Sequence, residues 1–149
     1  HVGNPSSTDA LEFQALLHTY VRAPANDVAI APLQGKYYVD KTEASLEARS
    51  KLKEEKREAV DVRVFTDSVY EDAPSKIDVT WPGGGLEVKM HEFNTLTVWN
   101  PQAEAGSKLG DMEVGGWYRF VCVEPGYVRG FKKLASGETW TGQQVLSLL

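Results

Sequence analysis

The 149-residue sequence is poor in the side chains that build disulfide frameworks and metal centres. Cys122 is its only cysteine, so no disulfide can form within the chain. It has only three histidines, one of them at the first position, and none follows the spacing of a metal site. We therefore predict no metal centre. A single cysteine also suits a reducing compartment.

The sequence also lacks a long apolar run and a basic surface. No stretch is long enough to span a membrane, and the first ten residues do not form a signal peptide. A formal net charge of −5 argues against nucleic-acid binding. Glycines 83–85 are not followed by the Lys-Ser/Thr of a phosphate loop, and no serine lies in a nucleophile elbow. We expect a cytoplasmic protein that binds neither nucleic acid nor membrane.

Short strands separated by turn residues are what the sequence does contain. Apolar and polar residues alternate over residues 60–65, 77–81 and 86–91, which is typical of half-buried strands. The Pro-Gly-Gly-Gly of residues 82–85 predicts a hairpin turn. Further strand candidates are residues 95–99, 117–123, 127–134 and 139–146. We predict an all-β fold, an antiparallel sandwich or barrel, in one domain over residues 1–149.

Two segments leave their secondary structure open. Residues 11–21 have apolar side chains at helical as well as strand spacing, so the pattern favours neither. Residues 43–58 are densely charged and show no clear apolar face. They predict a solvated loop or a short exposed helix.

Three side chains are candidates for chemistry, and each has a plainer interpretation. His18 lies among apolar neighbours, where a histidine is by default structural, yet imidazole titrates near neutral pH and delivers a proton at low cost. Glu124 ends an apolar strand, so it is either a partly desolvated base or a cap for backbone N–H groups. Asp67 follows another predicted strand, where aspartate is common in turns.

Other polar and aromatic residues give weaker evidence for a functional role. Asn100-Pro101 is an ordinary strand-to-turn signal, and Asp111 lies in a glycine-containing loop where it could be merely solvated. The four tryptophans are either core residues or a sugar-stacking face. They are Trp81, Trp99, Trp117 and Trp140.

Taken in order along the chain, several short motifs resemble glucose-6-phosphate 1-epimerases, a family within the galactose-mutarotase-like group. Each motif is weak alone, but the ordered set covers nearly the whole chain and is quite specific. The motifs are Leu17-His18-Thr19-Tyr20, Tyr38-Val39-Asp40-Lys41, Thr66-Asp67-Ser68-Val69-Tyr70, Val98-Trp99-Asn100-Pro101 with Gly110-Asp111-Met112, Val121-Cys122-Val123-Glu124-Pro125-Gly126, and Leu134-Ala135-Ser136-Gly137-Glu138-Thr139-Trp140.

The resemblance implies both a fold and a reaction. The fold is the large antiparallel β-sandwich, or supersandwich, of that group, with residues 11–21 as strand. The reaction is interconversion of the α and β anomers of glucose 6-phosphate, with His18 as general acid, Glu124 as general base and Asp67 as a ligand to sugar hydroxyls. Only protons move in this reaction, so no cofactor is implied. The alternatives are a carbohydrate-binding sandwich without catalysis and an aldose 1-epimerase for unphosphorylated sugars.

The sequence departs from the family in two respects. Val21, Gln102 and Tyr127 replace the residues usual beside the motifs, which puts substrate preference in doubt more than chemistry. Family members are roughly twice as long, and the resemblance places most phosphate-binding arginines in an N-terminal half.

We therefore expect this chain to be an incomplete, C-terminal part of the sandwich, inactive alone, with that half as its partner. We also expect six apolar residues to lose part of their burial without it. They are Val60, Val62, Val64, Leu86, Val88 and Met90.

Overall fold

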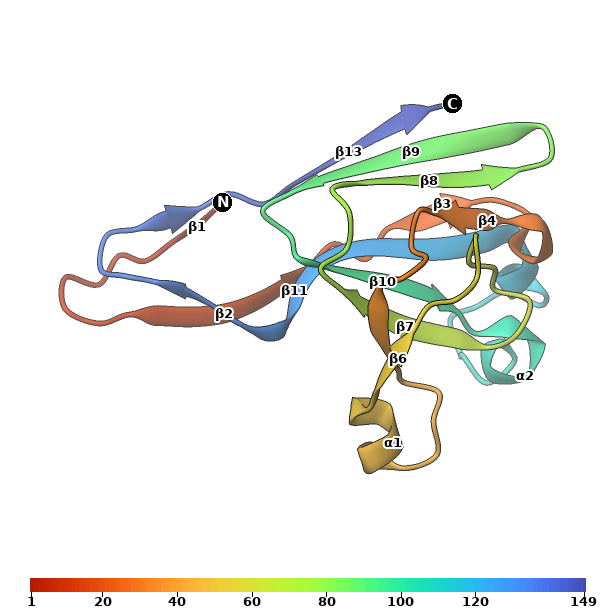
Figure 1. Ribbon diagram of the computed structural model, residues 1–149, viewed down its shortest axis with the longest axis horizontal. Helices are drawn as coiled ribbons and strands as arrows, with labels where there is room; N and C mark the ends of the chain where they lie inside the picture. Colours follow the sequence, from red (N-terminus) through yellow and green to blue (C-terminus); the bar gives the residue numbers. More distant parts are fainter.

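The alternating segments pair as antiparallel strands in two main sheets. A computed structural model describes residues 1–149. Its larger sheet has the order β2-β11-β10-β7-β5-β6, with the short β3 also paired to β11 (Figure 1). These strands are β2 (Leu11–Leu16), β3 (Tyr20–Arg22), β5 (Tyr37–Asp40), β6 (Leu52–Glu54), β7 (Thr66–Glu71), β10 (Thr95–Asn100) and β11 (Phe120–Leu134).

The smaller sheet lies over one face of the larger one and has the order β13-β9-β8-β4. Its strands are β4 (Ala29–Ala31), β8 (Lys76–Trp81), β9 (Gly84–His91) and β13 (Gln143–Leu148). A two-stranded sheet of β1 (Val2–Gly3) and β12 (Thr139–Trp140) lies beside the projecting β2–β11 arm (Figure 1). The predicted β8–β9 hairpin is confirmed, and Gly83 supplies the positive φ of 86° that its tight turn needs.

Helical structure is confined to the connections. Two short α-helices, α1 (Leu46–Ser50) and α2 (Gln102–Gly106), lie on the side of the larger sheet away from the smaller one (Figure 1). Two 3₁₀ turns occur, η1 (Ala25–Asp27) and η2 (Gly116–Arg119). No helix is long and apolar enough to cross a membrane.

The hydrophobic core lies between the two main sheets. It contains 17 buried residues, which come from both sheets and from the loops between them. The larger sheet contributes Val21, Tyr70, Leu96, Val98, Val121 and Val123, and the smaller contributes Ile30, Ile77, Val79, Val88 and Met90. A two-layer antiparallel β-sandwich is therefore confirmed.

Several sequence predictions change in detail. Residues 11–21 are extended, as the resemblance implied, but form two strands, β2 and β3. Residues 117–123 and 127–134 are not separate strands, because after η2 they continue as one 15-residue strand, β11, with a register shift between Tyr127 and Lys132. Residues 139–146 divide between β12 and β13.

The strand predicted over residues 60–65 is wrong. Only Val60 makes a bridge, to Ile30, and the rest of the segment is irregular. Val60 and Val62 are nevertheless fully buried, whereas Val64 is 70% exposed. The alternation of apolar and polar residues therefore indicated which side chains are buried in the core, although the segment does not pair as a strand. Residues 43–58 do contain a short exposed helix, α1, but also the unexpected strand β6.

The expected loss of burial is also wrong for four of the six residues. Val60, Val62 and Val88 are fully buried and Met90 is 5% exposed within this chain. The two main sheets cover each other's inner faces, so this core needs no further segment to close it.

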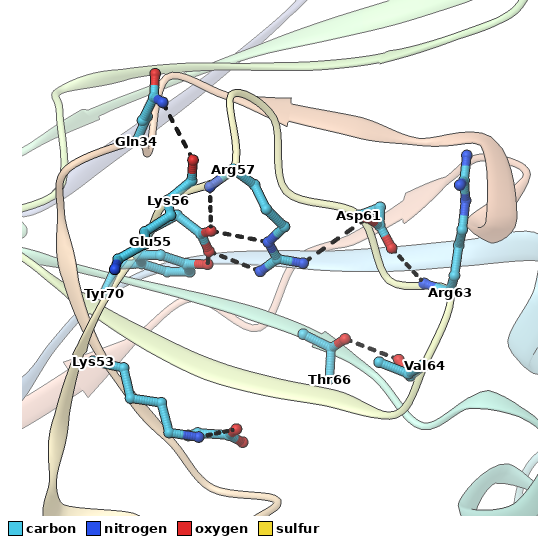
Figure 2. A network of polar contacts seen from close by, with 11 residues as sticks. Gln34, Lys53, Glu55, Lys56, Arg57, Asp61, Arg63, Val64, Thr66 and Tyr70 are labelled. Atoms are coloured by element: carbon cyan, nitrogen blue, oxygen red, sulfur yellow. Dashed lines mark hydrogen bonds and ion pairs between the residues drawn. The ribbon is translucent and has the colours of Figure 1, made fainter.

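A buried carboxylate ties β7 to the segment after β6. Glu55 is 2% exposed and accepts two hydrogen bonds from the Arg57 guanidinium, of 2.9 and 2.7 Å, and one of 2.7 Å from the Tyr70 hydroxyl (Figure 2). Burial alone would raise the pKa of Glu55, but these hydrogen bonds outweigh it and hold the pKa below its ordinary value. The cluster is fully satisfied, as a buried charge requires.

Removing this carboxylate should destabilise the fold. We expect Glu55→Ala to cost about 3 kcal/mol, because it leaves the buried Tyr70 hydroxyl without its acceptor and Arg57 without its partner. Urea denaturation measures the change, and Glu54→Ala is the matched control because Glu54 is exposed and its side chain makes no contact of this kind. Equal stability of the two variants would contradict a stabilising role for the cluster.

Candidate active site

The candidate site lies on the face of the larger sheet that points away from the smaller one, here called the site face. Successive strand residues point to opposite faces. Since Val121 and Val123 enter the core, Cys122 and Glu124 point to the site face. Strand register then places four residues in one row across the sheet. They are Asp67, Trp99, Cys122 and Tyr20.

Two backbone hydrogen bonds place His18 opposite Glu124. His18 lies in the break between β2 and β3, where the regular ladder stops. On one side of it the Leu17 N–H donates to the Pro125 carbonyl at 2.9 Å. On the other side the Val123 N–H donates to the Thr19 carbonyl at 3.1 Å. Because the two bonds bracket both residues, the imidazole and the carboxylate are brought face to face.

The two side chains are in contact. His18 Nδ1 lies 3.1 Å from Glu124 Oε1, an ion-pair distance, although the alignment is not that of a hydrogen bond. The Glu124 side chain is 4% exposed, whereas that of His18 is 49% exposed. The carboxylate is therefore desolvated, while the imidazole remains reachable from outside.

The environment of Glu124 favours its protonated form. Burial, together with the negative charge of Asp67, raises the pKa of Glu124 to about 7. Burial likewise raises the pKa of Asp67, against the nearby positive charges of Lys41 and Arg49. A carboxyl group that titrates near neutral pH beside an imidazole is an arrangement suited to proton transfer.

Aromatic rings surround the imidazole. Tyr20 stacks on His18 with ring centroids 4.9 Å apart and an interplanar angle of 7°, and Trp99 meets His18 edge-on at 5.9 Å. Phe120 lies against both Tyr20 and Trp99, at 5.0 and 5.8 Å. These contacts fix the plane of a side chain whose backbone lies outside the regular sheet.

A cavity of about 460 Å³ lies on the site face, and neither His18 nor Glu124 lines it. Tyr20 connects the cavity to the pair, because it lines the cavity and also stacks on His18. The lining residues come from β3, the start of β11 and the 101–119 loop. They are Tyr20, Arg22, Leu109, Asp111, Met112, Glu113, Gly116, Arg119 and Phe120.

Buried Asn100 anchors the 101–119 loop. Its side-chain amide donates to the carbonyls of Trp117 and Phe120, at 2.8 and 2.7 Å, and its side-chain oxygen accepts from the Gln102 N–H at 2.9 Å. Asn100, which the sequence indicated as an ordinary turn residue, therefore holds both ends of the loop that forms the cavity wall.

One group of side chains has ligand atoms close enough to hold a metal ion. The donors of His18, Cys122 and Glu124 lie within 4.8 Å of one another. Burial raises the pKa of the Cys122 thiol. The cluster contains the acid–base pair of His18 and Glu124.

The structure brings together the three residues that the sequence singled out. His18 and Glu124 touch, and Asp67 shares their face and is close enough to perturb Glu124. The sequence did not predict the contributions of Tyr20, Arg22 and Phe120. Counting every second residue along the strand would have placed Phe120 on the same face as Glu124. The positions of Tyr20 and Arg22 depend on the register of β3 against β11, which the sequence does not reveal.

The sequence matches the aldose 1-epimerase family over residues 2–147. The chain belongs to this family. Its fold is similar to that of YeaD from Salmonella typhimurium, a protein proposed to be a mutarotase, with a TM-score of 0.77, 22% identity, and coverage of 92% of this chain and 44% of that one. It is also similar to the crystal structure of HI1317, with a TM-score of 0.70, 18% identity, and coverage of 92% and 47%. The epimerase-family chain thus spans less than half the length of either structure.

Proposed function

We propose that this chain is the C-terminal half of a hexose-6-phosphate 1-epimerase and supplies its acid–base pair, with glucose 6-phosphate as substrate. The observation that carries the proposal is the contact between His18, half-exposed, and Glu124, buried with a raised pKa. Membership of the aldose 1-epimerase family supports a sugar substrate. A carbohydrate-binding sandwich without catalysis would need neither the contact nor the desolvation.

The geometry suggests how the two groups divide the work. Glu124 Oε1 faces His18 Nδ1, and no hydrogen bond within the protein engages Glu124 Oε2 or His18 Nε2. We assign Oε2 to take the proton of the C1 hydroxyl and Nε2 to donate one to the ring oxygen. The ring then opens, the C1–C2 bond rotates, and closure on the other face reverses both transfers.

The direct contact between the pair supports this cycle. Before ring opening the ionised carboxylate stabilises the imidazolium, so that acid and base hold opposite charges. After ring opening the imidazole is neutral and the carboxyl group is protonated, which is the state that ring closure requires, so closure itself restores the starting state. Asp67 would bind sugar hydroxyls on the same face.

Polarimetry on freshly dissolved α-glucose 6-phosphate tests the proposal. The whole protein should accelerate the approach to anomeric equilibrium, with unphosphorylated glucose as the comparison substrate. Acceleration of glucose alone would favour the aldose 1-epimerase alternative. Binding of either sugar without acceleration would favour the non-catalytic sandwich and would contradict the proposal.

The pH dependence of the reaction follows from the state of Glu124. A base acts only when deprotonated, so kcat/KM should rise with pH along a limb whose midpoint is about 7, the pKa to which burial and Asp67 raise the carboxyl group. Because His18 must be protonated to act as the acid, kcat/KM should fall again at higher pH. A profile of initial rates from pH 3.5 to 9 measures both limbs. A limb with its midpoint near 4.5, the ordinary value, would show that the base is not this desolvated carboxylate.

A further inference from the structure

The thiol of Cys122 has no part in the proposed acid–base mechanism, although it lies beside the pair. Cys122 and Glu124 are two residues apart on β11, so their side chains point to the same face of the sheet. The backbone hydrogen bonds of Leu17 and Thr19 to β11 bring His18 opposite them. One donor atom from each of the three side chains therefore lies within 4.8 Å of the other two. No spacing in the sequence reveals this cluster, because it joins one strand to a break between two others.

One oxygen of this cluster lacks the hydrogen bond that burial normally demands. Glu124 Oε1 is buried and has no hydrogen-bond partner, although it is 3.1 Å from His18 Nδ1. Buried polar atoms are nearly always satisfied, so each exception calls for an explanation. Cys122 is also buried and forms no disulfide, which leaves its sulfur available. Oxygen, sulfur and nitrogen donors therefore converge at one point.

The charge around the cluster favours a cation. Glu124 has no ion-pair partner other than His18, and Asp67, whose negative charge acts on Glu124, makes no ion pair. Lys41 and Arg49 act on Asp67 only from beyond ion-pair distance. Two desolvated carboxylates on one face therefore lack a close lysine or arginine, and a divalent cation bound among the donors supplies the missing charge.

We propose that His18, Cys122 and Glu124 form an inhibitory Zn²⁺ site that overlaps the catalytic pair. Zn²⁺ accepts nitrogen, sulfur and carboxylate ligands, and it is found with three protein ligands and an open fourth position. From the ordinary bond lengths of Zn²⁺, the ligand atoms of a tetrahedral site are about 3.5 Å apart, so a small movement of the side chains closes the site. The half-exposed His18 provides the route of entry.

Bound Zn²⁺ blocks both proton transfers. With Nδ1, the ring nitrogen that faces Glu124, held by the metal, His18 cannot become the imidazolium that protonates the ring oxygen. A carboxylate that binds the metal is likewise a weaker base towards the C1 hydroxyl. Burial raises the pKa of the Cys122 thiol, but metal binding releases the thiol proton to solvent, because a coordinating thiol is deprotonated outright. Metal binding is independent of the proposed function, whereas inhibition rests on it.

The binding part of the proposal is tested with Co²⁺, a spectroscopic substitute for Zn²⁺, titrated into the whole protein under reducing conditions. Co²⁺ bound to a thiolate gives a charge-transfer absorption in the near ultraviolet, and Zn²⁺, which thiolate ligands favour, should abolish it by displacement. Cys122→Ser should lose this absorption, since a hydroxyl is a poor ligand for either ion. His91→Gln is the matched control, because it removes an exposed histidine outside the cluster.

Glu124→Gln supplies a second variant, which keeps the thiol and the shape of the side chain. An amide is a weaker ligand than a carboxylate. The affinity for Co²⁺ should therefore fall by at least about tenfold, the scale seen when even a supporting residue of a metal site is removed.

The inhibitory part is tested by polarimetry on α-glucose 6-phosphate with added Zn²⁺. Saturating Zn²⁺ should lower kcat/KM of wild type by at least about a hundredfold, the scale of a lost general acid or base, and EDTA should restore it. Half-inhibition of Cys122→Ser should need at least about tenfold more Zn²⁺. Without metal, Cys122→Ser should be as active as wild type, because the mechanism does not use the thiol. His91→Gln should respond to Zn²⁺ as wild type does.

The outcomes separate this proposal from the proposed function. A wild type without thiolate absorption, or an absorption that either Cys122→Ser or Glu124→Gln retains at wild-type Co²⁺ affinity, overturns the site. An active wild type that Zn²⁺ inhibits no more than Cys122→Ser overturns inhibition at this cluster and leaves the reaction intact. Absorption that Cys122→Ser loses, in a protein that accelerates neither sugar, supports the metal site and overturns the reaction alone.

Discussion

Glu124→Gln should lower kcat on α-glucose 6-phosphate by at least about a hundredfold, the usual scale for a lost general base. The amide keeps the shape of the carboxylate but cannot accept the proton from C1. His18→Asn should have an effect of similar size, because asparagine cannot protonate the ring oxygen. Polarimetric initial rates measure both effects, and Glu47→Gln, at an exposed position on α1, is the matched control.

The same variant should gain stability, which distinguishes lost chemistry from lost folding. The pKa of Glu124 is raised from 4.5 to about 7 in the folded protein. The folded state therefore binds the proton more tightly than the unfolded state, and this stabilisation, complete below pH 4.5, is lost as pH rises through about 7. At pH 8 Glu124→Gln avoids burying the charge, so its Tm should exceed that of wild type. Near-normal activity in either Glu124→Gln or His18→Asn would contradict the mechanism.

The 149-residue chain expressed alone should show at least about a hundredfold less epimerase activity than the whole protein, since effects of this size follow when catalytic groups are not held in place. The chain spans less than half of the two structures that it resembles, and His18 is half-exposed. Without the remaining segment, water would reach the imidazole and the substrate would be bound from one side only.

The isolated chain should also self-associate, although its core is closed. The edge strand β13 and the end of the chain expose Val145, Leu146, Leu148 and Leu149, of which Leu148 is 88% exposed. Exposed apolar edge strands pair with other chains. Size-exclusion chromatography and polarimetry on the isolated chain, with and without the N-terminal half added in trans, measure both effects. A monomer as active as the whole protein would show that no further segment is needed.

Sequence patterns predicted the strands more reliably than the connections between them. Alternation correctly placed β8 and β9, because each has one face in the core. The strand candidate at residues 95–99 is confirmed as β10, which is buried along nearly its whole length. It failed for residues 60–65, where Val60 and Val62 reach the same core from an irregular segment. A period-two pattern indicates which side chains are buried, and a side chain can be buried without its backbone pairing in a β-sheet. The strand β6 was hidden because neither of its faces enters the core.

The chemistry of the site was predicted from residue type and resemblance, whereas its geometry was not. His18 and Glu124 are far apart in sequence, and their contact depends on two backbone hydrogen bonds between the 17–19 segment and β11. The positions of Arg22 and Tyr20 depend on the register of β3 against β11. Register is fixed by tertiary packing, so no reading of one strand alone reveals it.

The most direct test of the central claim is the exchange rate between the α and β C1–H signals of glucose 6-phosphate, measured by NMR at equilibrium in the presence of the whole protein. We predict that wild type increases this rate far above that of buffer, and that Glu124→Gln reduces the increase at least about a hundredfold while the sugar still binds. Exchange that is equally fast with Glu124→Gln and with wild type would show that the contact between His18 and Glu124 is not the catalytic pair.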